Sequence, residues 1–194
     1  MATNNSTGDS AGIGDMDSLF FTSSEANRSV SVTIADSNVI PIQDGLAFIA
    51  VREMQEEDQD GIINFSITLD DSAGNSTGQV FETNDGSFVW FDGTRPQLNQ
   101  VSFTSTNIGD SSLAISGDTL LLNFTSSEDL RDIEVSIAGF NADTNFFNVM
   151  QSSYQSWYVL QGIEEEGYVP FQITYSDLVG NNGDTIIATT DDTR

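Results

Sequence analysis

The sequence contains no cysteine, no histidine and no lysine, and only five arginines oppose its thirty acidic residues. The formal charge of −25 makes the surface strongly anionic. Nucleic acids and anionic lipids bind basic surfaces, so we expect neither as a partner. Without histidine or cysteine, the common catalytic triads, thiol nucleophiles and cysteine–histidine zinc sites are excluded as well.

Long apolar runs are also missing. No run approaches the roughly 20 residues that a transmembrane helix needs, and nothing near Met1 resembles a secretory signal peptide. We therefore expect no membrane insertion of this segment. A chain without cysteine and with excess carboxylates is typical of large bacterial surface proteins, whose self-repulsion a salty exterior screens. These features favour an extracellular or cell-surface location.

What the sequence does contain is an internal repeat. LFFTSSEANRSVSVTI (residues 19–34) matches LNFTSSEDLRDIEVSI (residues 122–137), and INFSITLDDSAGN (63–75) matches VPFQITYSDLVGN (169–181). Upstream, AGIGD (11–15) also matches LAISGD (113–118). The offset is about one hundred residues throughout, which is the length of one compact domain. The chain is therefore predicted to form two related domains, residues 1–94 and 95–194, joined by a short acidic linker.

The local pattern predicts strands. Val30, Val32 and Ile34 alternate with polar residues, and the same period recurs through both halves between glycine- and asparagine-rich turns. No stretch keeps helical spacing. The predicted fold is all-β, with two tandem Ig-like (cadherin-like) Greek-key β-sandwich domains of seven strands each.

The expected strands of the first domain are 16–23, 29–35, 38–42, 46–53, 61–70 and 78–91. Those of the second are 99–106, 118–125, 132–140, 145–150, 155–162, 168–176 and 184–190. The run Ser87 to Phe91 has no counterpart in the second domain. The first strand of the first domain is either short and irregular within Ala2 to Ser10, which we favour, or supplied by a neighbouring chain through strand addition.

The order of these motifs resembles the bacterial Ig-like, cadherin-like repeats that form long arrays in giant surface adhesins of the RTX extender type. The shared order is A-x-x-G-D, an apolar strand ending in Phe-Thr-Ser-Ser-Glu, V-x-V-x-I, and F-x-I-x-Y-x-D-x-x-G-N. One departure lies in the linker, where the usual Asp-Thr-Thr-x-Pro is Asp92-Gly93-Thr94-Arg95-Pro96. The resemblance implies a stalk stiffened by calcium and no catalysis.

The topology of such a sandwich predicts a metal site. The loops after the second and sixth strands lie at the end where the chain enters, and the loops after the first and fifth strands lie at the opposite end. Acidic residues occupy all of these loops, and Ca²⁺ is the ion that dense carboxylate and amide oxygens favour. The candidate ligands at the junction are Asp15, Glu56, Glu57, Asp58, Asp60, Asp92, Glu128, Asp177 and Asn181. The corresponding set facing a preceding domain is Glu25, Asp71 and Asn75, and Asp118 with Glu164, Glu165 and Glu166 would face a following one.

Simpler interpretations of the same residues stay open. Asp-x-x-Gly-Asn is an ordinary turn signal, and residues 56–60 read as a solvated acidic loop. Glu25 and Glu128 could instead pair with Arg28 and Arg131.

The predicted function is that of a non-catalytic stalk segment, monomeric, whose partners are neighbouring repeats of the same chain. Other regions of a full-length protein would then bind a host, glycan or surface ligand. The alternative is a carbohydrate- or protein-binding module that uses exposed aromatic residues. The candidates for such a platform are Phe88, Trp90, Phe91, Trp157 and Tyr158. Since Trp157 and Tyr158 are adjacent in a predicted strand, at least one of them should face the core. A carboxylate pair that hydrolyses glycosides is not expected, because the acids fall in loops without an evident cleft.

Overall fold

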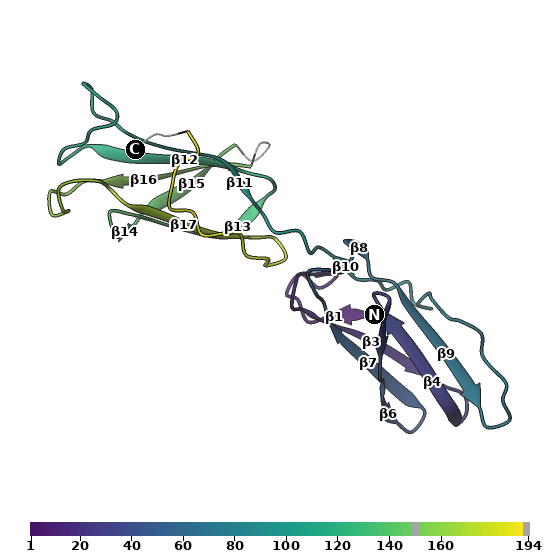
Figure 1. Ribbon diagram of the computed structural model, residues 1–194. Helices are drawn as coiled ribbons and strands as arrows, with labels where there is room; N and C mark the ends of the chain where they lie inside the picture. The colour runs from purple at the N-terminus through teal and green to yellow at the C-terminus, as the bar shows by residue number, and fades with distance from the viewer. Residues whose placement is uncertain (149–151, 192–194) are drawn as a thin grey trace. The chain divides into compact units, whose positions relative to one another are not determined.

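The computed structural model describes residues 1–148 and 152–191. Every element of regular secondary structure among them is a β-strand (Figure 1), which confirms the predicted all-β fold. The chain divides into two compact units, Met1–Thr94 and Arg95–Arg194. No helix in the described part of the chain has the length and hydropathy to cross a lipid bilayer.

The first unit is built from two main sheets and a small third one. The first sheet has the order β1 (Ala2–Thr3), β3 (Met16–Thr22), β7 (Ala47–Glu53) and β6 (Ile42–Asp44). The second has the order β5 (Ser37–Val39), β4 (Asn27–Ile34) and β9 (Phe65–Asp71), and Val80 bridges to β9 at Ile67. The third joins β2 (Ser10–Ala11), β10 (Trp90–Phe91) and β8 (Gly61–Ile62).

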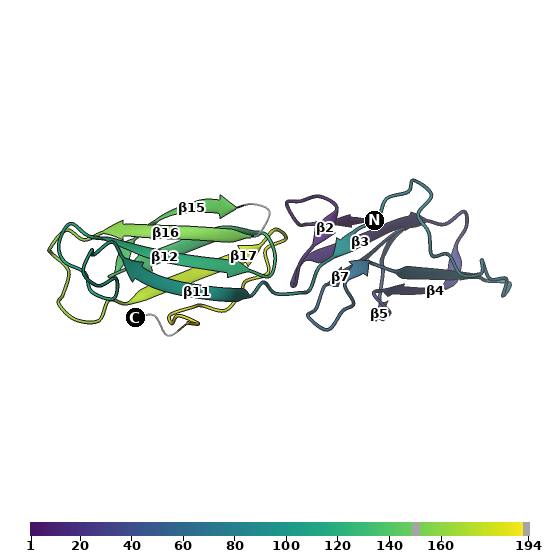
Figure 2. The same ribbon diagram turned by 90° about the horizontal axis from the view of Figure 1, so that it is seen from above.

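The second unit repeats the two main sheets. Its first sheet has the order β11 (Leu98–Ser105), β12 (Thr119–Ser126), β16 (Ser153–Val159) and β15 (Asp143–Asn148), and Figure 2 shows these strands side by side. Its second sheet has the order β14 (Phe140–Asn141), β13 (Leu130–Ile137) and β17 (Phe171–Asp177). Ile186 bridges to β17 at Ile173, as Val80 does to β9.

The strand order is that of an immunoglobulin-type sandwich in both units. One sheet carries strands A, B, E and D, and the other carries C′, C and F, with a residual G strand beside F. The period-2 alternation seen in the sequence explains the packing, because one face of each strand lies on the core. On β12, for example, Leu120, Leu122 and Phe124 are buried while the residues between them are only half-buried.

Several strand limits differ from those predicted. The segment 78–91 is not one strand: only Val80 and β10 pair, and a turn at Asn84-Asp85 lies between them. The predicted strand 61–70 is divided into β8 and β9, and the predicted strand 184–190 is reduced to a bridge at Ile186. The first strand of the first unit is short, as favoured above, with two residues in β1 against eight in β11. The predicted strand 145–150 runs partly outside the described residues.

Candidate metal-binding loops

Asp15 and Asp118 occupy equivalent turns before the second strand of each unit. Asp15 Oδ2 accepts hydrogen bonds from Asn5 Nδ2 (2.5 Å) and from the backbone amide three residues upstream (2.7 Å). Asp118 Oδ2 accepts the same two kinds of bond, from Asn107 Nδ2 (3.0 Å) and from the amide three residues upstream (2.9 Å). Both carboxylates therefore stabilise the four-residue turn that their Gly-Asp motif ends.

In the first unit, some acidic side chains of the loop 56–60 face solvent and others bind to the protein. Glu56 and Glu57 are exposed. Asp58 makes a two-pronged ion pair with Arg52, both N···O distances being 2.6 Å, with side chains only 10% and 14% exposed. Burial alone would raise the pKa of Asp58, but the hydrogen bonds and charge of Arg52 and the amide of Gln55 lower it. Asp58 thus joins the loop to strand β7.

Asp60 fastens the segment that leaves the first unit. Its Oδ1 accepts a hydrogen bond from the Gly93 amide (2.6 Å), and its Oδ2 accepts one from Thr94 Oγ1 (2.7 Å). Within the same segment, the Thr94 amide donates to Asp92 Oδ1 (3.1 Å). The linker residues are therefore held in a defined conformation by two carboxylates.

The second unit replaces the pair Arg52–Asp58 by Tyr158 and Glu164. Glu164 Oε1 accepts hydrogen bonds from Tyr158 Oη (2.8 Å) and the Gln161 amide (2.9 Å). Its Oε2 accepts hydrogen bonds from the backbone amides of Gly162 and Ile163. The Gln161 amide is the main reason why the pKa of Glu164 is lowered to about 2, although desolvation opposes the shift. A different donor therefore holds the same loop in each unit.

The loop after the sixth strand is organised by an aspartate in both units. Asp177 is 1% exposed, and its Oδ1 accepts amide hydrogen bonds from Val179, Gly180 and Asn181 at 2.7–2.9 Å. Its Oδ2 accepts one from Asn181 Nδ2 (2.7 Å). The turn interpretation of Asp-x-x-Gly-Asn therefore describes what this side chain does.

The equivalent aspartate of the first unit makes a smaller set of bonds and is more exposed. Asp71 accepts hydrogen bonds from the side chain (2.7 Å) and the amide (2.8 Å) of Asn75. The Asn75 side chain is the largest cause of the lowered pKa of Asp71, followed by the amide. This loop is therefore a more open version of the one at Asp177.

The repeated Phe-Thr-Ser-Ser-Glu motif forms the loop after the second strand. Ser23 Oγ donates to the carbonyl of Glu25 (2.7 Å), and Ser126 Oγ donates to the carbonyl of Glu128. The serine thus closes a tight turn and leaves the glutamate carboxylate at the end of the sandwich. In the second unit, Arg131 forms an ion pair with its neighbour Asp132, with 3.3 Å between Nε and Oδ2.

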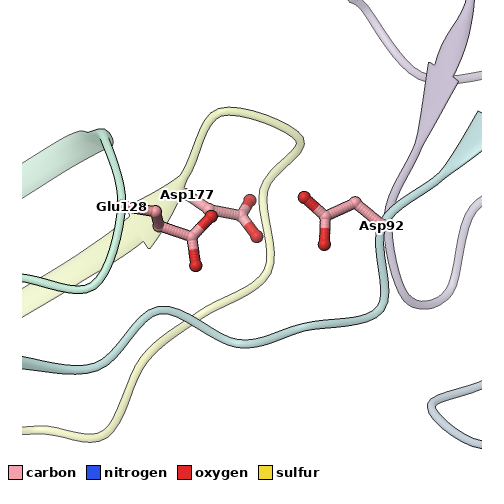
Figure 3. Close-up of side chains that lie close together, drawn as sticks. All are labelled: Asp92, Glu128 and Asp177. Atoms are coloured by element: carbon pink, nitrogen blue, oxygen red, sulfur yellow. The ribbon is translucent and has the colours of Figure 1, made fainter. Parts of the chain in front are cut away.

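Within the second unit, two of the predicted ligands come together. Glu128 and Asp177 offer carboxylate oxygens within 4.8 Å of each other, one from each loop (Figure 3). Two like charges at about 4 Å repel by roughly 1 kcal/mol in water and by several kcal/mol near a protein surface. A cation that bridges them would remove this cost, and carboxylate oxygens are the ligands that Ca²⁺ prefers.

The chain enters the second unit beside the same two loops. The Gln97 amide donates to Ser127 Oγ (3.0 Å), and the Ser127 amide donates to the Gln97 carbonyl (2.8 Å). Arg95 Nη1 donates to the carbonyl of Asn182 (3.0 Å). The segment 95–97 is therefore fixed between the loops that carry Glu128 and Asp177.

One acidic residue with an unusual environment was missed by sequence reasoning. Asp17, on β3, is 0% exposed, and neither carboxylate oxygen has a hydrogen-bond partner. Burial raises its pKa to about 6. The nearby Thr3 hydroxyl, which does not reach the geometry of a hydrogen bond, and Arg52 oppose the rise, and the charge of Asp15 adds to it. Alignment of the two repeats places Asp17 opposite the core residue Leu120, and that mismatch was the available signal.

The aromatic candidates do not form one platform. Phe91 is fully buried and so cannot belong to an exposed surface. Trp157 and Tyr158 are both half-buried; the Tyr158 ring packs against the core and stacks on Phe140 at 5.4 Å. Phe88 and Trp90 remain about half exposed, and β10 pairs Trp90 with the exposed Ile62.

No family model and no curated protein matches this chain. Among solved structures, the chain is similar to SGBP-B of the Bacteroides ovatus mixed-linkage glucan utilization locus, determined in complex with a mixed-linkage heptasaccharide. The sequence identity is 16% and the TM-score is 0.28. The match covers 93% of this chain but only 42% of that one. A similarity this low assigns no function.

Proposed function

We propose that the protein is a non-catalytic segment of a large secreted or cell-surface adhesin, in which β-sandwich repeats form a stalk stiffened by Ca²⁺. The observation that supports this best is the pair of carboxylates from Glu128 and Asp177 at the end of the second unit that receives the chain. Its partners in the stalk are neighbouring repeats, and we expect the chain to be monomeric.

In this proposal, Ca²⁺ is bound by the Glu128 carboxylate and by the Asp177 oxygen that accepts fewer hydrogen bonds. Asn181 is a further candidate ligand. Asp177 Oδ1 already accepts three amide bonds, whereas Oδ2 accepts one, so Oδ2 is the oxygen that a cation would use. Asp92 precedes the fixed residue Arg95 by three positions, a span of roughly 10 Å at most. We therefore propose the Asp92 carboxylate as a further ligand.

The remaining candidates take lesser roles. Asp15, Asp58, Asp60 and Asp71 are engaged in the hydrogen bonds described above and would hold the loops in place. The exposed Glu56 and Glu57 would add negative charge. The set Glu25, Asp71 and Asn75 would be the corresponding Ca²⁺ ligands facing a preceding repeat. Because metal binding would fix the linker, removal of Ca²⁺ should loosen it.

The test is thermal unfolding of the chain in EDTA, in millimolar Ca²⁺ and in equal Mg²⁺. Extracellular calcium sites have dissociation constants of roughly 10⁻⁴–10⁻³ M, and ligand at a hundredfold above that value stabilises by about 2.7 kcal/mol. We expect a Ca²⁺-specific rise in Tm that Glu128→Gln abolishes. In EDTA the Tm of this variant should equal or exceed that of the original chain, because the substitution removes the repulsion between Glu128 and Asp177. Glu134→Gln, an equal charge change at an exposed site of the same unit that is no candidate ligand, is the control. An equal response to Mg²⁺, or an unchanged response in Glu128→Gln, would contradict the proposal.

A second candidate function, a glycan-binding surface, is favoured by the neighbouring exposed rings of Phe88 and Trp90 beside Ile62. Aromatic faces of this kind stack on sugar rings. Titration with soluble oligosaccharides should then change the Trp90 fluorescence in a Trp157→Phe background, and Trp90→Ala should remove the binding. A stalk without glycan affinity would show no change.

A further inference from the structure

In the first unit, one end of the core is closed by the short strand β10, which lies between two loops. It pairs in parallel with β2 and antiparallel with β8. Val89 and Phe91 are fully buried, whereas Trp90 between them is about half exposed. Inward and outward side chains therefore alternate along this segment, and the inward ones are apolar.

Three backbone hydrogen bonds hold the segment to the two loops. They run from Trp90 N to Asp9 O (2.8 Å), from Asp92 N to Ala11 O (2.9 Å) and from Ile63 N to Val89 O (2.9 Å). The loops thus present backbone carbonyls and an amide to an extended strand.

The second unit contains both flanking loops. Two backbone hydrogen bonds recur in equivalent places: Gly14 N to Met54 O is matched by Gly117 N to Leu160 O, and Ala35 N to Asn64 O is matched by Ala138 N to Pro170 O. Gly61 and Gly167, which open the second loop, share the same unusual backbone, with φ of 125° and 129°. On this alignment, Ala114 corresponds to Ala11 and Val169 corresponds to Ile63.

Between these two loops the second unit has a groove of about 890 Å³, at the place where the first unit has β10. The buried side chains of Phe103, Leu120 and Leu160 line it, so its inner surface is apolar. Among the described residues of the second unit, no strand lies between the two loops. The same site is therefore filled in one unit and open in the other.

Two backbone groups that hold β10 in the first unit lack a partner in the second. Among the described residues, none donates a hydrogen bond to the Ala114 carbonyl and none accepts one from the Val169 amide. Both residues are half-buried, whereas their equivalents Ala11 and Ile63 are buried. Unpaired backbone groups at such positions favour pairing with an added strand.

The loops around the groove expose apolar surface. Leu113, Ile115 and Tyr168 line the groove and are each more than 60% exposed. Large exposed apolar residues that gather around an apolar groove are typical of a binding surface for another molecule.

The same loops carry negative charge. Glu165 and Glu166 are exposed and line the groove, and none of the lining residues, all of which the structure describes, is basic. The Glu164 carboxylate is occupied by hydrogen bonds within its own loop. The two exposed carboxylates would attract a cationic occupant and repel an acidic one.

We propose that this groove binds an extended segment of a separate protein, in which apolar side chains alternate with lysine or arginine. The apolar side chains point into the groove, as Val89 and Phe91 do in the first unit, and the basic ones lie beside the two exposed glutamates. The backbone of the segment donates to the Ala114 carbonyl and accepts from the Val169 amide. This is strand addition, with specificity set by alternate side chains. The inference depends on neither calcium nor the stalk function.

The test uses the peptide Lys-Val-Arg-Phe-Lys, acetylated and amidated, which keeps the inward valine and phenylalanine of β10 and makes the outward positions basic. The full chain, labelled with ¹⁵N, is titrated with it in EDTA and low salt. We expect saturable shifts of the backbone amide signals confined to residues 103–105, 112–116 and 164–169. The charge-inverted peptide Glu-Val-Asp-Phe-Glu and the polar peptide Lys-Ser-Arg-Ser-Lys should each bind roughly tenfold more weakly or worse.

Methylation of single peptide nitrogens tests the backbone pairing. The last lysine of the probe takes the place of Asp92, whose amide donates to the Ala11 carbonyl, so methylating that nitrogen should abolish binding. Methylating the valine nitrogen is the matched control, because the Val89 amide donates to no backbone carbonyl among the described residues. This control peptide should bind like the probe.

Variants of the protein test the charge at the groove. The double variant Glu165→Gln with Glu166→Gln should weaken binding of the probe about fivefold, since it removes two exposed carboxylates. The double variant Glu56→Gln with Glu57→Gln is the matched control, an equal charge change at an adjacent exposed pair in the first unit. It should leave the affinity unchanged.

Three results would overturn the proposal. Equal binding of the probe and its charge-inverted or polar counterpart, or equal weakening by both double variants, would mean unspecific attraction to the anionic surface. Absence of shifts at the groove would mean that it accepts no such strand. Shifts of the same signals with chain concentration, in the absence of peptide, would assign the groove to a second copy of this chain instead.

Discussion

At the scale of single residues, the buried carboxyl of Asp17 costs the first unit stability at neutral pH. Its pKa of about 6 in the fold lies above the ordinary 3.8, so the folded state binds the proton more tightly than the unfolded chain. Stability should therefore decrease as the pH rises from about 4 to about 6, by about 3 kcal/mol at most. Below pH 4 both states are protonated and the cost disappears.

We predict that Asp17→Leu, which copies Leu120 of the second unit, raises the unfolding free energy of the first unit by about 2 kcal/mol at pH 7. The gain should shrink toward pH 4. Urea unfolding followed by Trp90 fluorescence, in a Trp157→Phe background, measures it. Leu120→Asp is the reciprocal control and should destabilise the second unit. A loss of stability in Asp17→Leu at pH 7 would show instead that the carboxylate has a stabilising partner.

The ion pair between Arg52 and Asp58 gives a second prediction at this scale. Removing one member of a buried pair leaves the other charge unpaired, so Asp58→Asn should cost about 3 kcal/mol at pH 7. Because the pKa of Asp58 is lowered, this contribution is present above its ordinary value of 3.8 and lost as the pH falls below it.

Replacing the ion pair of the first unit by the tyrosine–glutamate pair of the second tests whether the loop needs a specific contact or only opposite charges. The double variant Arg52→Tyr with Asp58→Glu reproduces Tyr158 and Glu164, and its urea midpoint should lie above that of Asp58→Asn. A double variant no more stable than the single one would mean that the two loops are held by other contacts.

At the scale of elements, substitutions at the two adjacent residues of β10 should differ in their cost to stability. Phe91 fills the core, so Phe91→Ala should cost the first unit about 3–5 kcal/mol through lost burial and a cavity. Trp90 lies on the opposite, half-exposed face, so Trp90→Ala should cost less than about 1 kcal/mol. Circular dichroism during urea unfolding compares the two. Similar losses in both variants would contradict the inward direction of Phe91.

At the scale of the whole molecule, the net charge of −25 makes repulsion between carboxylates the main long-range electrostatic effect on stability. Raising the salt concentration shortens the screening length from about 30 Å at 0.01 M to about 3 Å at 1 M, which weakens repulsion between carboxylates. We predict that NaCl raises the Tm by several degrees across this range, with KCl equally effective. At the same total ionic strength, millimolar Ca²⁺ should raise the Tm more than NaCl or KCl does. A Tm that falls with salt would mean that attractive pairs outweigh the repulsion.

Much of the fold could be predicted because its determinants are local. The alternation around Val32 and Phe124 sets which face of each strand is buried, and turn residues such as those after Asp71 and Asp177 set where strands end. Parts of the candidate site could not be predicted in this way. That Asp58 is bound to Arg52, or that Asp177 accepts four hydrogen bonds, depends on which groups the loops present to each other.

By itself the sequence determined the all-β class, the inward faces of the strands and the anionic surface, since each follows from side-chain period and composition. Only the tertiary structure decided that Asp17 is buried, that Phe91 belongs to the core, and that Glu128 and Asp177 approach each other. It also decided that the second unit keeps an open groove where β10 closes the first. The physical reason is that burial and contact between residues distant in sequence arise from packing, which neighbouring residues alone do not specify.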